Sequence, residues 1–173
     1  AVVFLPRSDR SAGTGSRRGS RTPGSRILGM GSSSNNAGTD PSPPPMVRTW
    51  QFTGNNSWQA LSPDISNTTF NDGTGRKIQL DNAGTTMIVS APLSNTGASS
   101  GGELKVYTYE GSWTQPSSNY SIYGGDTEPS QFQDYCGSSA ALSGDGKLII
   151  IVCTGFNDHP ANNRARIRFF RIE

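Results

Sequence analysis

Charged residues and long hydrophobic runs are both scarce in this sequence. Only 16% of its 173 residues are charged and 32% are hydrophobic, and the longest apolar run extends from Leu148 to Cys153. A run of that length forms one buried strand and is far shorter than the roughly 20 residues of a membrane-spanning helix. The 21 glycines and 11 prolines exclude a coiled coil or a helical bundle. They are typical of a β-rich protein with many turns.

The residues that enzymes use for catalysis are also sparse. The one histidine, His159, follows Asp158 directly, and neighbours in sequence do not face each other as a catalytic pair must. No Gly-x-Ser-x-Gly segment occurs, and the glycine clusters at residues 73–75, 101–102 and 124–125 lack the Gly-Lys pair and the expected helix of a phosphate loop. The aspartates stand singly in segments typical of turns. We therefore expect no catalytic residue, no metal site, no cofactor and no enzyme activity.

Charge and composition divide the chain at about residue 46. Residues 1–46 contain six arginines and two aspartates, hence a net charge of +4, whereas residues 47–173 contain nine basic and eleven acidic groups, hence −2. The first segment is rich in Ser, Gly, Pro and Arg, and residues 5–49 include no aromatic side chain. Such a segment buries too little apolar surface to offset the entropy of ordering itself. We expect residues 1–46 to form an extended arm that is ordered by partners.

The arm offers two kinds of side chain to a partner surface. Its arginines can bind carboxylates, phosphates or carbonyl groups, and its two short apolar segments can act as anchors. We expect residues 47–173 to fold without the arm and to lose attachment to the partner. The expected partner-binding residues are Val3, Phe4, Leu5, Arg7, Arg10, Arg17, Arg18, Arg21, Arg26, Ile27 and Leu28.

The chain beyond residue 46 repeats itself. Each copy reads as a strand, a glycine turn and a tryptophan, then a hairpin, a long polar loop and an alternating strand. The hairpin turns at residues 81–84 and 143–146 place Gly, Asn and Asp where positive φ is needed. The pattern predicts one leading strand and two antiparallel meander repeats, at about 54–110 and 111–173. The matching segments are Val47–Phe52 with Leu104–Tyr109 and Ile167–Ile172, Trp58 with Trp113, Lys77–Gly84 with Ala140–Gly146, and Thr86–Ser90 with Leu148–Val152.

Aromatic side chains occupy related positions in these copies. Because the positions recur, we expect the rings to pack between sheets rather than to line a ligand site. The residues concerned are Trp50, Trp58, Tyr107, Tyr109, Trp113, Phe169 and Phe170.

The order of these segments resembles FG-GAP-like β-propeller repeats over residues 47–173. The stretch Ile88-Val89-Ser90-Ala91-Pro92, followed by Gly101 to Tyr107, is similar to the motif that gives the family its name. The resemblance implies blade-like antiparallel sheets. Since propellers close with roughly four to eight blades, two units cannot close. We therefore expect a mainly β fold that forms an incomplete propeller or a small sandwich. No Asp-x-Asp-x-Asp-Gly loop occurs, so the calcium binding of some propellers is not implied.

As a whole, the chain resembles a nucleus-encoded peripheral subunit of a diatom photosystem I supercomplex. FG-GAP-like repeats are abundant in diatoms, and an Arg- and Ser-rich, acid-poor start is typical of organelle-targeted chains. The resemblance implies a non-catalytic subunit that stabilises photosystem I with its light-harvesting antenna. It would bind core polypeptides in single copy, without nucleic acid or a membrane span. The implied location is the thylakoid periphery of the plastid, on the stromal rather than the lumenal side.

Two other function classes stay open. One is an organellar ribosome protein or another RNA-associated protein that uses the Arg-rich arm, although lysine is scarce and the module is slightly acidic. The other is an extracellular adhesion or carbohydrate-binding module, for which we would expect a secretory signal and a closed propeller.

The two cysteines are candidates for a cross-strand pair. A two-residue turn on Gly144-Asp145, continued without a bulge, places Cys136 directly opposite Cys153. That geometry fits a disulfide, and it equally fits two thiols that face each other. A stromal position favours reduced thiols, whereas an oxidising lumen favours the bond. Both residues also fit the role of small apolar fillers in a buried sheet.

Overall fold

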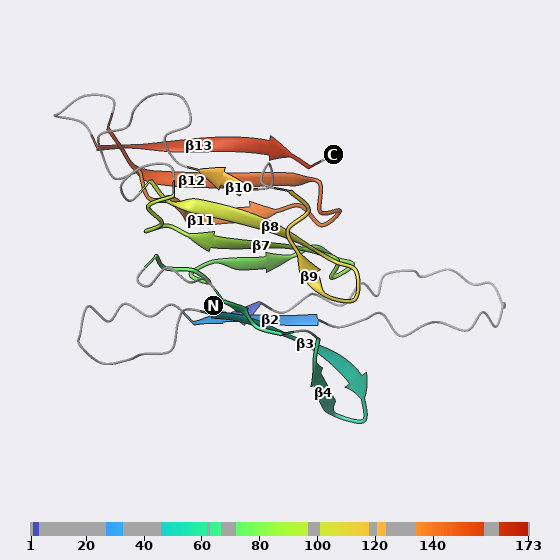
Figure 1. The fold of residues 1–173 in the computed structure, drawn as a ribbon. Coiled ribbons are helices and arrows are strands. Elements are labelled where there is room, and N and C mark those ends of the chain that lie inside the picture. Colours follow the sequence, from blue (N-terminus) through green and yellow to red (C-terminus); the bar gives the residue numbers. More distant parts are fainter. Residues whose placement is uncertain are drawn as a thin grey trace, which may run out of the picture.

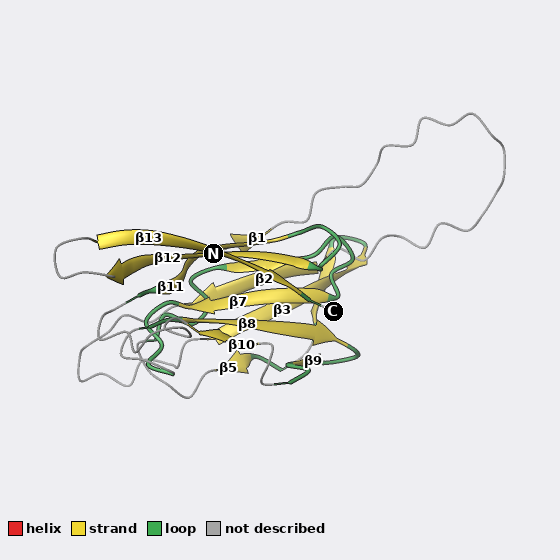
Figure 2. Cartoon of the chain, turned by 90° about the horizontal axis from the view of Figure 1, so that it is seen from above, coloured by secondary structure: helices red, strands yellow, loops and turns green. Residues whose placement is uncertain are grey.

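A computed structural model describes residues 2–3, 27–32, 46–61, 63–66, 72–96, 101–117, 121–123, 134–157 and 163–172. Every regular element among them is a strand and none is a helix (Figure 2). It follows that no helix in this part of the chain is long and apolar enough to cross a membrane. The mainly β fold class predicted from the sequence is confirmed.

The strands of the described residues form three antiparallel sheets, and none of these sheets closes into a barrel. Sheet A has the order β1-β2-β3-β4, with β5 also on β3; its strands are β1 (Val2–Val3), β2 (Ile27–Ser32), β3 (Met46–Gly54), β4 (Ser57–Ala60) and β5 (Ile65–Ser66). Sheet B has the order β10-β8-β7-β6, with β9 also on β8; its strands are β6 (Ile78–Leu80), β7 (Thr86–Ala91), β8 (Glu103–Tyr109), β9 (Trp113–Thr114) and β10 (Ser121–Tyr123). Sheet C has the order β11-β12-β13; its strands are β11 (Cys136–Leu142), β12 (Leu148–Asn157) and β13 (Asn163–Arg171).

Sheet B is the middle layer of the stack. In Figure 1 sheet C lies at the top, sheet B below it and sheet A at the bottom. Alternate side chains of β7 point to opposite sides, so that Met87 and Val89 join a core cluster with sheet A, while Ile88 joins a cluster with sheet C. Because both faces of β7 are covered, the strand is buried from residue 87 to residue 91.

The prediction of two repeats and one leading strand is incomplete, because the described strands form three sheets. The predicted leading strand lies within β3, where β2 pairs along one side and β4 along the other. Strands β1 and β2 come from the segment that the sequence assigns to a partner-ordered arm. Residues 27–32 are therefore part of the chain's own fold.

The predicted hairpin turn of the second repeat is too short. Leu142 pairs with Ile149, and the Ser143 nitrogen donates to the carbonyl of Leu148, so four residues rather than two form the turn. The turn between β6 and β7 is built in the same way, since the Asp81 nitrogen donates to the carbonyl of Thr86. The two turns thus correspond residue by residue.

Candidate functional site

The described residues offer little chemistry for catalysis. They contain no group of three or more His, Cys, Asp or Glu side chains that could hold a metal ion, and His159 lies outside them. A hollow of about 370 Å³ beside β8 is lined by Glu103, Lys105 and mostly neutral polar side chains. The Glu103 carboxylate lies 3.5 Å from the Lys105 amine and accepts a hydrogen bond of 3.3 Å from Ser94. Glu103 and Lys105 therefore form an ion pair with each other.

The predicted partner-binding residues of the arm have different environments in the structure. Val3 lies in β1 and pairs with Gly29, and Ile27 is buried in the core between sheets A and B. The prediction that Ile27 binds a partner is therefore wrong, because its side chain already packs against the turn at Gly84. Leu28 is half-buried on the opposite face of β2. The remaining predicted positions lie outside the described residues, namely Phe4, Leu5, Arg7, Arg10, Arg17, Arg18, Arg21 and Arg26.

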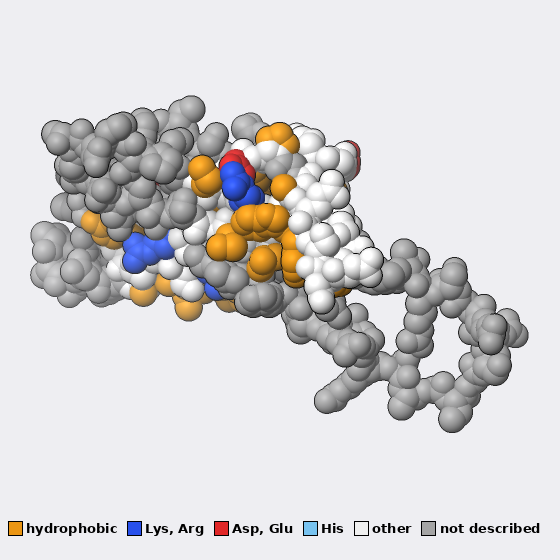
Figure 3. All heavy atoms as spheres, turned by 90° about the horizontal axis from the view of Figure 1, so that it is seen from below, with side chains coloured by type: hydrophobic (Ala, Val, Ile, Leu, Met, Phe, Trp, Pro, Cys, Tyr) orange, Lys and Arg blue, Asp and Glu red, His pale blue; other side chains and the backbone are white. Residues whose placement is uncertain are grey.

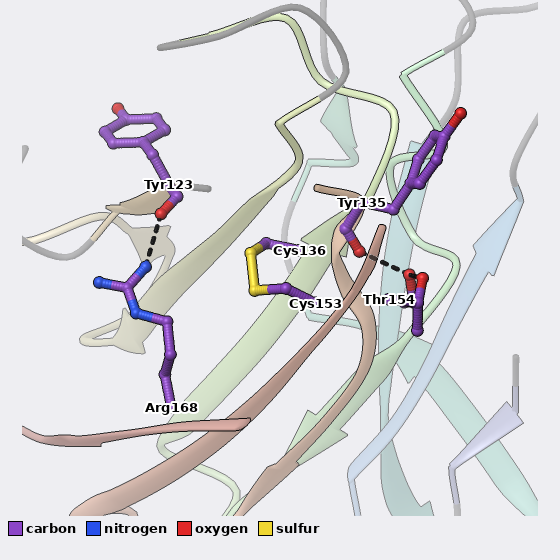
Figure 4. The surroundings of a disulfide bond; sticks show 7 residues. Tyr123, Tyr135, Cys136, Cys153, Thr154 and Arg168 are labelled. Atoms are coloured by element: carbon purple, nitrogen blue, oxygen red, sulfur yellow. Dashed lines mark hydrogen bonds between the residues drawn. A yellow bond between two sulfur atoms is a disulfide. The ribbon is translucent and has the colours of Figure 1, made fainter. Parts of the chain in front are cut away.

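Cys136 and Cys153 are directly opposed, as predicted, and form a disulfide (Figure 4). Their Cα atoms are 3.9 Å apart, and both side chains are buried in the core between sheets B and C. The register behind the prediction was nevertheless wrong. The wider turn shifts the pairing by two residues, and a bulge at Gly137 and Ser138 shifts it back. The structure contains the bond rather than the reduced thiols that a stromal position favours.

Arg166 and Arg168 of β13 lie on the same face of sheet C as this disulfide, the face that packs on sheet B. Arg168 donates a 2.8 Å hydrogen bond to the carbonyl of Tyr123 (Figure 4), and its guanidinium lies 4.8 Å from the centre of the Phe170 ring. Burial raises the pKa of the nearby Asp134 carboxyl, while the charges of Arg166 and Arg168 lower it. Among the described residues, Asp134 Oδ1 has no hydrogen-bond partner. These charges belong to the boundary between sheets B and C.

The outer surface of sheet C is apolar and open. We call it the C face. Leu148 is 44% exposed, Ile167 is 59% exposed and Phe169 is 66% exposed. The register places Ile150 beside Phe169 and Val152 beside Ile167, so these side chains form one continuous surface. The C face comprises Leu148, Ile150, Val152, Ile167 and Phe169.

The internal repeat identifies the residues of sheet B that are equivalent to those of the C face. Ile150, Ile167 and Phe169 occupy the positions that Ile88, Leu104 and Val106 have in sheet B. Those three side chains of sheet B are at most 1% exposed, because sheet C covers them. The expectation that Phe169 packs between sheets is therefore wrong, since no described residue covers it, whereas Phe170 does pack between sheets B and C.

The outer surface of sheet A is the opposite end of the stack. We call it the A face, and it comprises Leu28, Met30, Trp50, Phe52 and Trp58. Met30 is 42% exposed and Trp58 is 43% exposed. Seen from this side, hydrophobic side chains gather next to a basic and acidic pair (Figure 3). Arg48 lies beside Met30 in the register and pairs with Asp64, and the hydrogen bond from its guanidinium lowers the pKa of that carboxyl.

The rings of the A face also have counterparts in sheet B, of which Trp113 is buried and Tyr109 is partly buried. Phe52 and Trp58 pack edge to face with centroids 5.3 Å apart, and Tyr109 and Trp113 pack with centroids 5.2 Å apart. Trp113 is buried against sheet A, where its indole donates a 2.7 Å hydrogen bond to the Thr49 hydroxyl. The expectation of packing between sheets is thus confirmed for Trp113, whereas Trp58 is exposed.

Comparisons with known proteins add no relative to this description. Neither a protein-family model nor a curated protein matches the sequence.

Proposed function

We propose that this chain is a non-catalytic interaction module that joins a larger assembly through the outer faces of its sheets. The C face carries this proposal. Its apolar side chains are 44–66% exposed at Leu148, Ile167 and Phe169, while the repeat-related side chains of sheet B are buried. Contiguous apolar surfaces of this kind mark sites of protein association.

A protein partner fits these faces better than RNA does. An RNA-binding surface presents positive charge to the solvent. On β13, Arg166 and Arg168 lie on the side that faces sheet B, where Arg168 is bound to the carbonyl of Tyr123. The outward-facing residues between them and beside them are Ile167 and Phe169.

The narrower expectation is a peripheral subunit of a diatom-type photosystem I, on the stromal side of the thylakoid. It rests on the resemblance of the sequence alone and stays a prediction, and the Cys136–Cys153 disulfide argues against its stromal side. Isolation of the tagged chain from thylakoids, followed by identification of the polypeptides that migrate with it on a native gel, tests it directly.

The general proposal is tested in cells that produce the protein. The full chain and its Phe169→Glu variant are tagged, and their migration on native gels is compared. A charge on the C face should shift most of the chain from the large assembly to the free fraction. Ser112→Glu, in the exposed turn between β8 and β9, is the matched control and should migrate as the natural chain does. If both variants keep the chain in the assembly, the C face is not the docking surface.

A further inference from the structure

The three sheets stack in the same orientation, so that equivalent strand faces point in the same direction along the stack. Val47 of β3, Leu104 of β8 and Ile167 of β13 occupy equivalent positions. Val47 is 1% exposed because it faces sheet B, and Leu104 is 0% exposed because it faces sheet C. Ile167 points in the same direction and is 59% exposed. The stack therefore ends on a surface that elsewhere in the chain is always followed by another sheet.

The opposite end of the stack has the complementary surface. Met87 of sheet B packs against sheet A, and Ile149 of sheet C packs against sheet B. Leu28 holds the equivalent position on the A face, where it lies beside Trp50. The same packing therefore occurs twice within the chain. At the A–B boundary and again at the B–C boundary, a sheet surface equivalent to the A face packs on a sheet surface equivalent to the C face.

We propose that the partner on the C face is a second copy of this chain, which packs its A face there. This inference rests on the proposed function and names the partner of the same surface. The contact would continue the two boundaries already present in each molecule. It is heterologous, because different surfaces of the two copies meet, so each dimer still has one open face of each kind. Repeated addition then produces a ring if the rotation closes, or a filament if it does not.

Charge does not oppose this contact. Among the described residues, the A face has one ion pair, Arg48 with Asp64, whose charges cancel. The register puts Arg171 beside Leu148 at one margin of the C face. Like charges are therefore not brought together between the apolar centres of the two faces.

The test uses the purified full chain and measures its mass in solution over a wide range of concentration. Two variants each block one face: Phe169→Glu blocks the C face and Met30→Glu blocks the A face. We expect the natural chain to form species larger than a dimer, and each variant alone to be monomeric. An equimolar mixture of the two variants should form a dimer and nothing larger, because the open A face of one variant binds the open C face of the other. Ser112→Glu should assemble as the natural chain does.

Each other outcome overturns the inference. A natural chain that is monomeric at every concentration has no self-association. A variant that still dimerises alone has an isologous contact between two identical faces, and a mixture that stays monomeric has no head-to-tail contact. If the purified chain is monomeric while Phe169→Glu releases it from its assembly in cells, the second copy is the wrong partner and the proposed function stands. Circular dichroism confirms that each variant is folded.

Discussion

Tyr107 shows how one partly buried side chain makes stability depend on pH. Burial and, secondarily, the charge of Glu103 raise the pKa of Tyr107 from 10.0 to about 12. The folded protein therefore holds this proton more tightly than the unfolded chain does. Its contribution to stability is complete below the unfolded pKa and is lost as the pH rises towards the folded pKa. We expect Tyr107→Phe to remove this dependence.

Urea unfolding of the natural protein and of Tyr107→Phe measures the effect. Between about pH 8 and about pH 11, the natural protein should lose about 1.4 kcal/mol more unfolding free energy than the variant. An equal loss in both proteins would show that Tyr107 does not titrate in this way.

Gly102 is a position where both conformation and space require glycine. Its φ is +80°, and a Cβ there would overlap the Cys136 carbonyl oxygen and lie 2.5 Å from the Cys136 nitrogen. Gly111 has a similar φ of +89° but no atom within 4 Å of such a Cβ. Gly111→Ala should cost about 1 kcal/mol of unfolding free energy, the cost of the conformation alone. Gly102→Ala should cost at least about 2 kcal/mol more, because sheets B and C must separate at this point.

Thermal and urea unfolding of the two glycine variants provide the comparison. Equal losses of unfolding free energy in the two variants would mean that the boundary between sheets B and C accommodates a Cβ at Gly102 without an energetic penalty.

At the scale of elements, the repeated turn is the clearest unit. Asp81 Oδ1 accepts hydrogen bonds from the nitrogens of Thr85 and Thr86, and the Ser143 hydroxyl accepts them from the nitrogens of Lys147 and Leu148. The same backbone geometry is thus stabilised by two different side chains. Asp81 is buried and its two hydrogen bonds are partly buried, so its loss leaves two partly buried donors without partners.

We expect Asp81→Ala to reduce the unfolding free energy by about 2 kcal/mol and Ser143→Ala to reduce it by about 1 kcal/mol. Asp81→Ser should recover at least half of the loss, because serine already performs this role at the equivalent position. A serine variant as unstable as the alanine variant would contradict the equivalence of the turns.

The whole molecule depends on sheet A as one of its three layers. Gly29 of β2 lies against the core, where a Cβ would be 3.3 Å from Ile78 and 3.8 Å from Leu80. Removal of residues 1–46 takes away β1 and β2 and uncovers these side chains. Each large apolar side chain so exposed costs about 1.5–3 kcal/mol, against a total stability of about 5–15 kcal/mol. The expectation that residues 47–173 fold without the arm therefore needs revision.

We expect the deletion of residues 1–46 to lower the melting temperature and to produce dye-binding apolar surface. The matched control replaces residues 33–45 with Asn-Gly, since Ser32 and Met46 are paired and a two-residue turn can join them. This control should melt near the natural protein. A deletion variant that melts like the natural chain would show that sheet A contributes no stability.

Local signals in the sequence predicted much of the fold. Alternation and turn residues predicted strands at 104–109, 148–152 and 167–172; the first two lie within β8 and β12, and the third ends one residue beyond β13. The cysteine pair was also predicted, but only because two errors cancelled. A wider turn and a bulge are local choices of backbone conformation that alternation alone does not specify.

Strand β2 was missed because its sequence is a poor strand signal. It contains Gly29 and Gly31, and glycine weakens a strand in isolation. The tertiary structure explains both residues, since a Cβ on Gly31 would lie 2.8 Å from the Cα of Gly75. The close approach of β2 to the turn before β6 thus requires glycine at this position. The approach brings together residues that are distant along the chain.

The sequence by itself determined the fold class, the hairpins and the internal repeat, because these depend on neighbouring residues. Only the tertiary structure decided which strand faces are covered. Leu104 and Ile167 stand in the same alternating pattern, yet one is buried and the other is exposed. Periodicity shows that a face is apolar, whereas burial depends on whether another sheet packs upon it. The open A and C faces are therefore a property of the stack of three sheets rather than of any single strand.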